Sequence, residues 1–309
     1  MKQFAMLFPG QGSQAVGMLA ELAAYYPVVQ ETFSLASDVL GYDLWQITAQ
    51  GPAEELNKTW QTQPALLTAS MAIWRVWQQQ GGKKPVLMAG HSLGEYSALV
   101  CAGALDFQEA VRLVELRGKL MQEAFPEGAG AMYAIIGLDN EAIAAACEAS
   151  AQGQVVSLVN FNSPGQVVIA GNKEAVERAG SACKEAGAKR ALPLPVSVPS
   201  HCVLMKPVAE KLAEALKTIT FTTPAIPVVN NVNVRIETDP NAIRMALVKQ
   251  LYSSVRWTEC VSYVAAQGVD VLLEMGPGKV LIGLAKNIVD TLSAAAVNDL
   301  ASLSAALEK

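Results

Sequence analysis

The chain has 309 residues, of which 51% are hydrophobic and 17% are charged. This composition supplies ample material for a core and excludes an intrinsically disordered chain. Lysine and arginine total 23 against 28 aspartate and glutamate residues, so the net charge is −5. A mildly acidic chain without a basic block is a poor candidate for binding nucleic acid or an anionic membrane, and we expect neither as a partner. No apolar run approaches the length of a bilayer span.

The cysteines bear on the cellular compartment. There are five of them, far apart and without a C-x-x-C pair: Cys101, Cys147, Cys183, Cys202 and Cys260. This pattern argues against a disulfide framework or a zinc site, and it predicts a reducing, cytoplasmic location. The reactivity of Cys202 stays open because its neighbour is His201. The apolar segment 4–8 is too short for a signal-peptide core and predicts a buried strand instead.

Residues 1–125 are predicted to alternate between strands and helices. The predicted elements are a strand over 2–8, a helical segment over 14–40 broken at Pro27, a helix over 64–80 ended by Gly81 and Gly82, a strand over 86–89, and helices over 95–105 and 107–125. Strands that alternate with helices are typical of an α/β domain with a parallel sheet.

A different pattern begins after a boundary marked by Pro126, Gly128 and Gly130. The predicted elements over 131–196 follow the order β-α-β-β-α-β, which is that of a ferredoxin-like unit. We therefore expect a small domain at 129–197, inserted into a larger α/β domain formed by 1–128 and 198–309. The larger domain resumes with helices over 206–218 and 240–252 and a strand over 269–274.

Residues 90–94 carry the strongest functional signal, because they read Gly-His-Ser-Leu-Gly between a predicted strand and a predicted helix. This is the order of a nucleophile elbow. Gly90 and Gly94 keep bulk away from the turn, which lifts the Ser92 hydroxyl out of the sheet. The backbone N–H of Leu93 is then free to donate to an oxyanion. The alternative is a glycine-rich turn that merely closes a βα unit, and the strand-to-helix context favours the nucleophile.

A serine hydroxyl is a weak nucleophile and needs a base within hydrogen-bond reach. The chain has two histidines. His91 is a doubtful base for its neighbour Ser92, because adjacent residues at such a turn point in different directions. We therefore expect His201 to be the base, the alternative being a core histidine at a domain junction. A third group usually orients the histidine of such a pair. No aspartate or glutamate stands out for this role, and a backbone or amide oxygen is the alternative.

Two further features, Arg117 and the segment 8–14, are candidates for binding a substrate carboxylate and an oxyanion. Arg117 falls on the apolar face of its predicted helix, where a guanidinium must find an anion. That anion is either a core carboxylate in an internal salt bridge or the carboxylate of a substrate. The segment 8–14, Phe-Pro-Gly-Gln-Gly-Ser-Gln, follows the first strand. It is either a β-to-α turn or a loop whose Gln11 N–H completes an oxyanion hole with Leu93.

These segments together resemble the bacterial malonyl-CoA:acyl-carrier-protein transacylases of type II fatty acid synthesis. The motifs are FPGQGSQ at 8–14, TQPAL at 62–66, GHSLGEYSAL at 90–99, RG at 117–118, NSPGQ at 162–166, VPSH at 198–201 and GPGKVL at 276–281. They are spread in order over essentially the whole chain and are far more specific than the elbow alone. Polyketide-synthase acyltransferases often carry HAFH where this chain has VPSH, so their selectivity rule does not apply.

The resemblance implies a hydrolase-like α/β core with a ferredoxin-like insert and a ping-pong transfer of malonyl from malonyl-CoA to acyl carrier protein. No metal or cofactor is implied, and we expect a monomer. By resemblance, Ser92 carries the acyl group, His201 is the base and Arg117 binds the malonyl carboxylate. The other implied roles are an oxyanion hole from the N–H groups of Gln11 and Leu93, orientation of His201 by the Gln250 main-chain carbonyl, and pocket lining by His91 and Asn160.

Two other functions stay open from the sequence. A serine thioesterase or esterase of the same fold would use water as the acceptor, and a non-catalytic subunit would only bind acyl-CoA or a carrier protein. The inward Arg117 favours the transferase, and the intact pair of Ser92 and His201 argues against the binding subunit. Carrier proteins of this family's pathway are typically acidic, so we expect local basic residues near the cleft. The candidates are Lys189, Arg190, Lys206 and Arg256.

Overall fold

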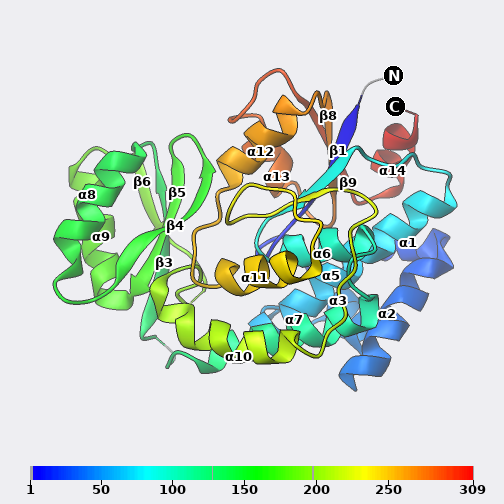
Figure 1. Cartoon of the computed structure of the whole chain (residues 1–309), viewed down its shortest axis with the longest axis horizontal. Helices are drawn as coiled ribbons and strands as arrows, with labels where there is room; N and C mark the ends of the chain where they lie inside the picture. The colour runs from blue at the N-terminus through cyan, green and yellow to red at the C-terminus, as the bar shows by residue number, and fades with distance from the viewer. Residues whose placement is uncertain (1–2, 127, 197, 309) are drawn as a thin grey trace.

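Two separate β-sheets organise the chain (Figure 1). This computed structural model describes residues 3–126, 128–196 and 198–308. The larger sheet is parallel throughout. Its strands, in spatial order, are β7 (Val228–Val229), β2 (Leu87–Gly90), β1 (Phe4–Phe8), β8 (Val271–Met275) and β9 (Ser293–Val297).

The larger sheet is covered by helices on both faces, which explains why its central strands are almost entirely apolar. Alternate residues of β1 enter different cores, as the period of a strand requires. Met6 and Phe8 belong to the larger core and Ala5 and Leu7 to the smaller one. The helices that contribute to the larger core are α1 (Ala20–Tyr25), α2 (Pro27–Leu40), α3 (Leu44–Gln50), α4 (Ala53–Leu56), α5 (Thr59–Gln79), α6 (Leu93–Cys101), α7 (Phe107–Glu123), α10 (Lys206–Leu216), α11 (Pro240–Gln250) and α14 (Leu300–Leu307).

The opposite face is covered by α12 (Trp257–Ala266) and α13 (Val280–Ala285). Between β8 and α13 runs the glycine-rich turn 276–279. A Cβ built on Gly276 would lie 2.4 Å from the Pro9 side chain, so this turn packs directly on the loop after β1. Glu274 accepts hydrogen bonds from the N–H groups of Leu281 and Ile282 at 3.1 and 3.0 Å. The motif GPGKVL therefore has a structural role beneath the first loop.

The second sheet is antiparallel, with its strands in the order β4-β5-β3-β6. Its elements are β3 (Gly130–Ile136), α8 (Asn140–Ala151), β4 (Val156–Ser163), β5 (Gln166–Asn172), α9 (Lys173–Glu185) and β6 (Arg190–Pro193). Helices α8 and α9 pack on one face and share a hydrophobic core with it. This order is ferredoxin-like, as predicted. All six elements lie within the predicted insert 129–197, whose last residue, 197, is outside the described residues.

The small sheet is joined to the larger domain by backbone hydrogen bonds at one place. The N–H of Val255 donates to the carbonyl of Val159 at 2.8 Å, and the N–H of Phe161 donates to the carbonyl of Val255 at 3.0 Å. In addition, Ser254 Oγ donates to the carbonyl of Leu158 at 2.9 Å. Strand β4 is therefore bonded to the segment that links α11 to α12.

Several predicted boundaries were wrong. The predicted helix over 64–80 begins earlier, at Thr59, and Pro64 lies inside it. A proline inside a helix loses its own N–H bond and crowds the carbonyl four residues earlier, and burial of most of this helix outweighs that cost. The segment 14–40 holds two helices that begin only at Ala20, and 14–19 forms turns and irregular backbone. The sequence patterns gave no prediction for β7, α12, α13, β9 or α14.

Candidate active site

Ser92 stands between β2 and α6, at the tip of a strained turn. Its backbone has φ 52° and ψ −108°, a conformation rarely adopted outside functional sites. The glycines of the turn are required sterically. A Cβ on Gly90 would lie 1.9 Å from the backbone of Gly94, and one on Gly94 would lie 2.0 Å from the carbonyl of Phe8. The sequence pattern thus forms the strand, sharp turn and helix that it predicts.

His201 reaches Ser92 from a distant part of the chain. Its Nε2 lies 2.8 Å from the Ser92 Oγ, and its Nδ1 lies 2.8 Å from the main-chain carbonyl oxygen of Gln250. A carbonyl only accepts hydrogen bonds, so Nδ1 carries the proton and Nε2 is free to accept the serine proton. The expectation that a backbone oxygen, and no acid, orients the histidine agrees with this geometry.

Arg117 is buried beside the serine without a carboxylate partner. It is 1% exposed, and none of the ion pairs between described residues includes it. Nη1 donates to Gln63 Oε1 at 2.8 Å, and Nη2 donates to Gln250 Oε1 at 3.1 Å and to Ser92 Oγ at 3.3 Å. The alternative of an internal salt bridge was therefore wrong. Neutral oxygens hold the guanidinium at the nucleophile, which leaves its charge available to a ligand.

These side chains line one pocket of about 110 Å³. Its lining residues are Gln11, His91, Ser92, Leu93, Arg117, Met121, Met132, Asn160, Leu194, Val196, Ser200 and His201. The structure thus brings all of the predicted site residues except Gln250 to the pocket wall, and Gln250 lies directly behind it. A second hollow of about 230 Å³ shares Gln11 and Val196 with this pocket and extends it outward. The inner pocket has room for a small acyl group only.

The two residues predicted to form an oxyanion hole, Gln11 and Leu93, both line the pocket. Leu93 is the first residue of α6, where a backbone N–H has no partner within the helix. Among the described residues, neither its N–H nor that of Gln11 has a hydrogen-bond acceptor. Two free donors at the rim of a pocket that contains a serine hydroxyl are the arrangement an oxyanion hole needs.

His91 and Asn160 occupy the side of the pocket formed with the small domain. The Nε2 of His91 lies 2.8 Å from Asn162 Oδ1, and its ring packs edge-on against Trp257 at 5.4 Å. His91 therefore points away from the serine, as expected, and lines the pocket. The Oδ1 atom of Asn160 is buried and has no partner among the described residues, so it is available to a ligand N–H.

Electrostatics keep His201 neutral. Burial, and after it the positive charge of Arg117, lower the pKa of His201 to about 3, although the hydrogen bond to the Gln250 carbonyl opposes them. Burial also lowers the pKa of Arg117, and nearby Tyr96 and Glu95 oppose that effect. A neutral imidazole is the form that accepts a proton, so His201 is in its basic form throughout the neutral pH range.

Three buried polar residues behind the pocket were not singled out by the sequence. Gln63 binds Arg117, Asn231 Oδ1 accepts from the N–H of Ser92 at 2.8 Å, and Glu95 accepts from the N–H of Asn231 at 2.9 Å. Burial raises the pKa of Glu95 to about 7. Gln63 and Glu95 stand inside the motifs TQPAL and GHSLGEYSAL, but as single residues they carried no signal. Asn231 lies in no such motif.

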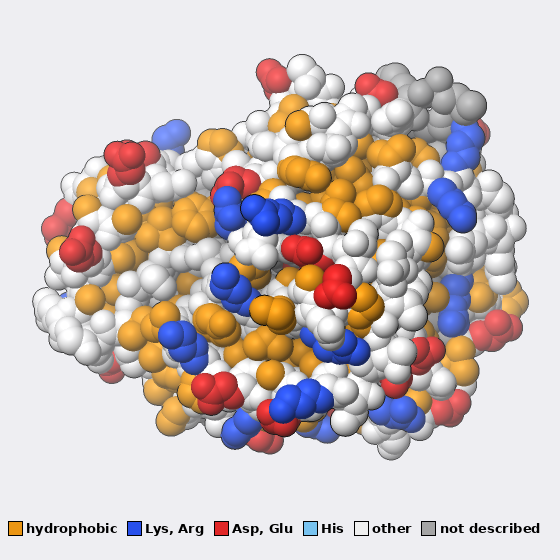
Figure 2. All heavy atoms as spheres, in the orientation of Figure 1, with side chains coloured by type: hydrophobic (Ala, Val, Ile, Leu, Met, Phe, Trp, Pro, Cys, Tyr) orange, Lys and Arg blue, Asp and Glu red, His pale blue; other side chains and the backbone are white. Residues whose placement is uncertain are grey.

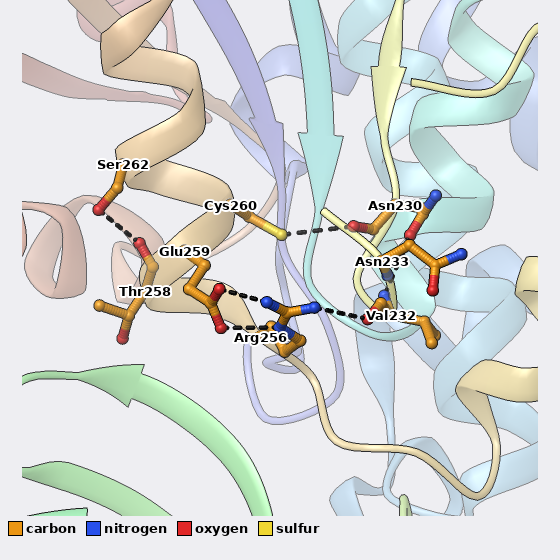
Figure 3. Close-up of polar contacts among 8 residues, drawn as sticks. All are labelled: Asn230, Val232, Asn233, Arg256, Thr258, Glu259, Cys260 and Ser262. Carbon is orange, nitrogen blue, oxygen red and sulfur yellow. Dashed lines mark hydrogen bonds and ion pairs between the residues drawn. The ribbon is translucent and has the colours of Figure 1, made fainter. Parts of the chain in front are cut away.

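A much larger hollow, of about 800 Å³, lies apart from this chemistry. It is lined by Phe161, Ser163 and Arg256, among others, and by none of the predicted catalytic side chains. Figure 3 shows that Arg256 is paired with Glu259 and also donates to the carbonyl of Val232 at 3.2 Å. Its charge is therefore already compensated, and size alone does not identify the functional pocket.

Other classes of site are not represented in the part of the chain that the structure describes. No group of three or more His, Cys, Asp or Glu side chains within it is arranged to hold a metal ion. None of the described helices combines the length and the apolar character that a bilayer span requires. All five cysteines are buried free thiols, and burial raises the pKa of Cys202 to about 11.

Comparison with known proteins places this geometry in context. The acyl transferase domain family matches residues 5–305. A malonyl CoA-acyl carrier protein transacylase of Salmonella typhimurium is 74% identical over 307 residues, covering 99% of each chain. That of Bacillus subtilis is 45% identical over 309 residues, covering 100% of this chain and 97% of the relative.

Solved structures agree with these relatives. An acyl carrier protein S-malonyltransferase from Vibrio cholerae superposes with a TM-score of 0.96 at 69% identity, covering 98% of this chain and 99% of the other. A structure described as a type II PKS acyl-carrier protein in complex with its malonyl-transacylase matches with a TM-score of 0.98 at 73% identity, covering 99% of each chain. Both the sequence and the fold are thus shared over essentially the full length.

Proposed function

The chain belongs to the acyl transferase family and, within it, to the malonyl CoA-acyl carrier protein transacylases; from this premise we propose that it moves malonyl groups from malonyl-CoA to the phosphopantetheine thiol of an acyl carrier protein through a Ser92 ester. One observation supports the proposal above all. A single oxygen, the Oγ of Ser92, contacts both His201 Nε2 and Arg117 Nη2. Nucleophile, base and carboxylate-binding cation therefore meet at one atom.

The distance between nucleophile and cation favours a short dicarboxylic acyl group. Arg117 Nη2 lies 3.3 Å from Ser92 Oγ. In a malonyl group, only one methylene separates the reacting carbonyl carbon from the carboxylate carbon. A longer diacid would carry its carboxylate past the guanidinium. A buried cation also disfavours an acyl group without a carboxylate, because the charge then stays unpaired.

In the first half-reaction, the Ser92 Oγ attacks the thioester carbonyl of malonyl-CoA while its proton moves to His201 Nε2. The carbonyl oxygen becomes an oxyanion, and the free N–H groups of Gln11 and Leu93 are positioned to stabilise it. The C–S bond then breaks, and the coenzyme A sulfur takes the proton from His201. The Gln250 carbonyl stabilises the transient imidazolium through Nδ1–H, less strongly than a carboxylate would.

The second half-reaction runs the same steps with another thiol. The phosphopantetheine thiol of the carrier protein gives its proton to His201 and attacks the Ser92 ester. The oxyanion forms again at the same N–H groups. The C–O bond to the serine then breaks, and Ser92 recovers its proton from His201. Carbon keeps its oxidation state throughout, so the transfer needs no redox cofactor. The N–H groups of Gln11 and Leu93 would stabilise the oxyanion in place of a metal ion, and we propose that none is needed.

The two hollows fit the two parts of such a substrate. The inner pocket of about 110 Å³ holds the malonyl group at Ser92. The outer hollow of about 230 Å³, lined by Asn57, Lys58 and Gln122 among others, would take part of the flexible arm that leads to coenzyme A or to the carrier protein. We also propose a cytoplasmic monomer, the location being supported by five free and buried thiols.

Intact-mass spectrometry after incubation with malonyl-CoA tests the proposal. We expect a malonyl adduct on the enzyme that disappears when an acyl carrier protein bearing phosphopantetheine is added, with a matching gain on the carrier. Ser92→Ala should abolish the adduct, and His201→Ala should slow both half-reactions by about a thousandfold or more. Ser181→Ala, an exposed serine of α9, is the matched control and should behave as wild type.

The same experiment separates the alternatives. Release of free malonate without transfer to the carrier would identify a hydrolase. Absence of both adduct and turnover in a folded protein would leave only a binding subunit. An adduct that survives Ser92→Ala would place the acyl group on another residue.

A further inference from the structure

A buried carboxylate that touches no reacting atom lies directly behind the site. Glu95 is three residues after Ser92 and is 2% exposed. No lysine or arginine among the described residues forms an ion pair with it. Its Oε2 instead accepts two hydrogen bonds, from the N–H of Asn231 at 2.9 Å and from Gln250 Nε2 at 2.8 Å. Burying a carboxylate without a cationic partner costs free energy, and these two hydrogen bonds offset part of that cost.

The Gln250 side chain connects this carboxylate to the guanidinium of Arg117. Its Nε2 donates to Glu95, and its Oε1 accepts from Arg117 Nη2 at 3.1 Å. A carboxylate only accepts and a guanidinium only donates, so one orientation of the amide satisfies both neighbours. The flipped amide would set its NH₂ group against the guanidinium and its oxygen against the carboxylate. Nε2 also donates to the main-chain carbonyl of Ser92 at 3.1 Å, so Glu95 and this carbonyl together determine which end of the amide Arg117 meets.

Arg117 lies over the Tyr96 ring, 5.3 Å from its centroid, and few hydrogen bonds fix the orientation of its guanidinium. Apart from Ser92 Oγ, its hydrogen bonds go to the side-chain oxygens of Gln63 and Gln250, and its Nε has no acceptor among the described residues. Nη2, the nitrogen nearest the nucleophile, is the one bonded to Gln250. Losing that acceptor would release the part of the guanidinium that recognises the substrate.

Glu95 also supports the elbow by a separate route. Glu95 accepts a hydrogen bond from the backbone of Asn231. The Asn231 side chain in turn accepts a hydrogen bond from the N–H of Ser92 and donates one through Nδ2 to the carbonyl of Gly90 at 2.8 Å. Asn231 makes its contact with Glu95 through the backbone, which any acceptor at that position satisfies. The two routes are therefore chemically distinct. Only the Gln250 route requires a group that cannot donate.

We propose that Glu95 is a positioning residue for recognition of the acyl carboxylate, acting by fixing the Gln250 amide and thereby aiming Arg117 Nη2 at the space beside Ser92. This inference rests on the proposed function. Preorganised donors bind an incoming charge more strongly than mobile ones, because their orientation costs nothing at the moment of binding. The role concerns substrate selection, and Glu95 itself takes no part in proton transfer.

The test compares Glu95→Gln with wild type at pH 8, where the Glu95 carboxylate is ionised. The substitution keeps shape and one acceptor but allows either end of the amide to face Gln250. We expect KM for malonyl-CoA to rise about tenfold, as for loss of a charged hydrogen bond, with a smaller effect on kcat. Acylation of Ser92 by p-nitrophenyl acetate, a neutral ester, should fall much less. Glu185→Gln, exposed on α9, is the matched control.

A double-mutant cycle tests the route. Gln250→Met removes the side-chain amide and keeps the main-chain carbonyl that orients His201. If both residues act through the same link, the double variant should raise KM no more than the worse single variant does. Additive effects would overturn the proposal. So would an unchanged or lower malonyl KM in Glu95→Gln, an equal loss for the neutral ester, or failure of Glu95→Gln to fold, which would make the carboxylate purely structural.

The proposal and the function on which it rests fail in different ways. Wild-type enzyme that neither loads nor transfers malonyl would refute the proposed function. Wild-type transfer with normal malonyl KM in Glu95→Gln would refute the positioning role alone.

Discussion

The guanidinium of Arg117 donates to the hydroxyl oxygen of Ser92 across 3.3 Å, while the same hydroxyl lies 2.8 Å from Nε2 of His201. The cation proposed to bind the substrate carboxylate therefore contacts the proposed nucleophile directly. Its charge also helps to keep His201 unprotonated. A malonyl carboxylate that pairs with Arg117 would offset that charge and make His201 a stronger base. Substrate recognition and nucleophile activation are thus electrostatically coupled in this site.

Arg117→Ala should lose malonyl transfer while retaining or gaining acetyl transfer. A guanidinium left unpaired disfavours acetyl, and a carboxylate buried without its partner disfavours malonyl. Removing one partner of such a pair costs roughly 2–5 kcal/mol, or about 30-fold to several-thousand-fold in specificity. Arg117→Lys should restore malonyl transfer only partly, because an ammonium lacks the planar fork. The measurement is kcat/KM for both thioesters. An equal loss for both, or an unfolded variant, would indicate a structural role.

The pH profile of Ser92 acylation should lack the inflection of an ordinary histidine. Burial and Arg117 lower the pKa of His201 to about 3, so the base stays neutral as the pH falls from 8 to 5. The rate with p-nitrophenyl acetate, which carries no carboxylate, should be nearly flat over that range. In Arg117→Ala the inflection should move upward and stay below the usual histidine value, since burial remains. An inflection near pH 6.5 in the wild-type enzyme would contradict this prediction.

Gly90→Ala and Gly94→Ala should each destroy the elbow. Their new methyl groups would lie 1.9 and 2.0 Å from backbone atoms, so the turn has to move. We expect a loss of Ser92 acylation and a fall in thermal stability. The matched control is Gly283→Ala in α13, where nothing lies within 4 Å of the added Cβ. That change should be neutral or stabilising by up to about 1 kcal/mol. Normal acylation in both elbow variants would show that the turn is not needed.

Charge reversal at Lys189, Arg190 and Lys206 should raise KM for the carrier protein at low salt without altering malonyl loading. All three are exposed, Arg190 at the start of β6 and Lys206 at the start of α10. Between these two elements lie four residues that line the pocket, Leu194, Val196, Ser200 and His201. Figure 2 shows basic side chains scattered among hydrophobic ones on one face, so any attraction must be local.

The fourth candidate, Arg256, is paired with Glu259 and should contribute less than the other three. Lys84→Glu is the matched control, because Lys84 is exposed near the amino end of β2, opposite the end that carries Ser92. Unchanged KM in all three reversals would exclude these residues as the docking site.

The elbow and the insert could be predicted from the sequence, but the network of buried hydrogen bonds behind the elbow could not. Ser92 could be predicted because its glycines are dictated by close backbone contacts that leave a visible pattern. Glu95 could not, since it is one of twelve acids between Ser92 and His201, and no local context distinguishes it from the others. Its importance comes from Asn231 and Gln250, which lie more than a hundred residues away and are brought to it by folding.

Helices and strands could likewise be predicted where local sequence patterns determine them. The order β-α-β-β-α-β is visible because each element is local and regularly punctuated. Pro64 misled the helix prediction because tertiary burial of α5 outweighs a local rule. Strand β7, with two residues, is too short to leave a periodic signal, although it forms the edge of the parallel sheet.

The division of the pocket between the two domains has an evolutionary consequence. The groups proposed to perform chemistry, Ser92, Arg117, His201 and Gln250, all come from outside the small sheet. That sheet supplies Met132 and Asn160 to the opposite wall. A single continuous stretch, exchanged or mutated as a unit, can therefore reshape the space offered to an acyl chain while the reaction itself is inherited intact.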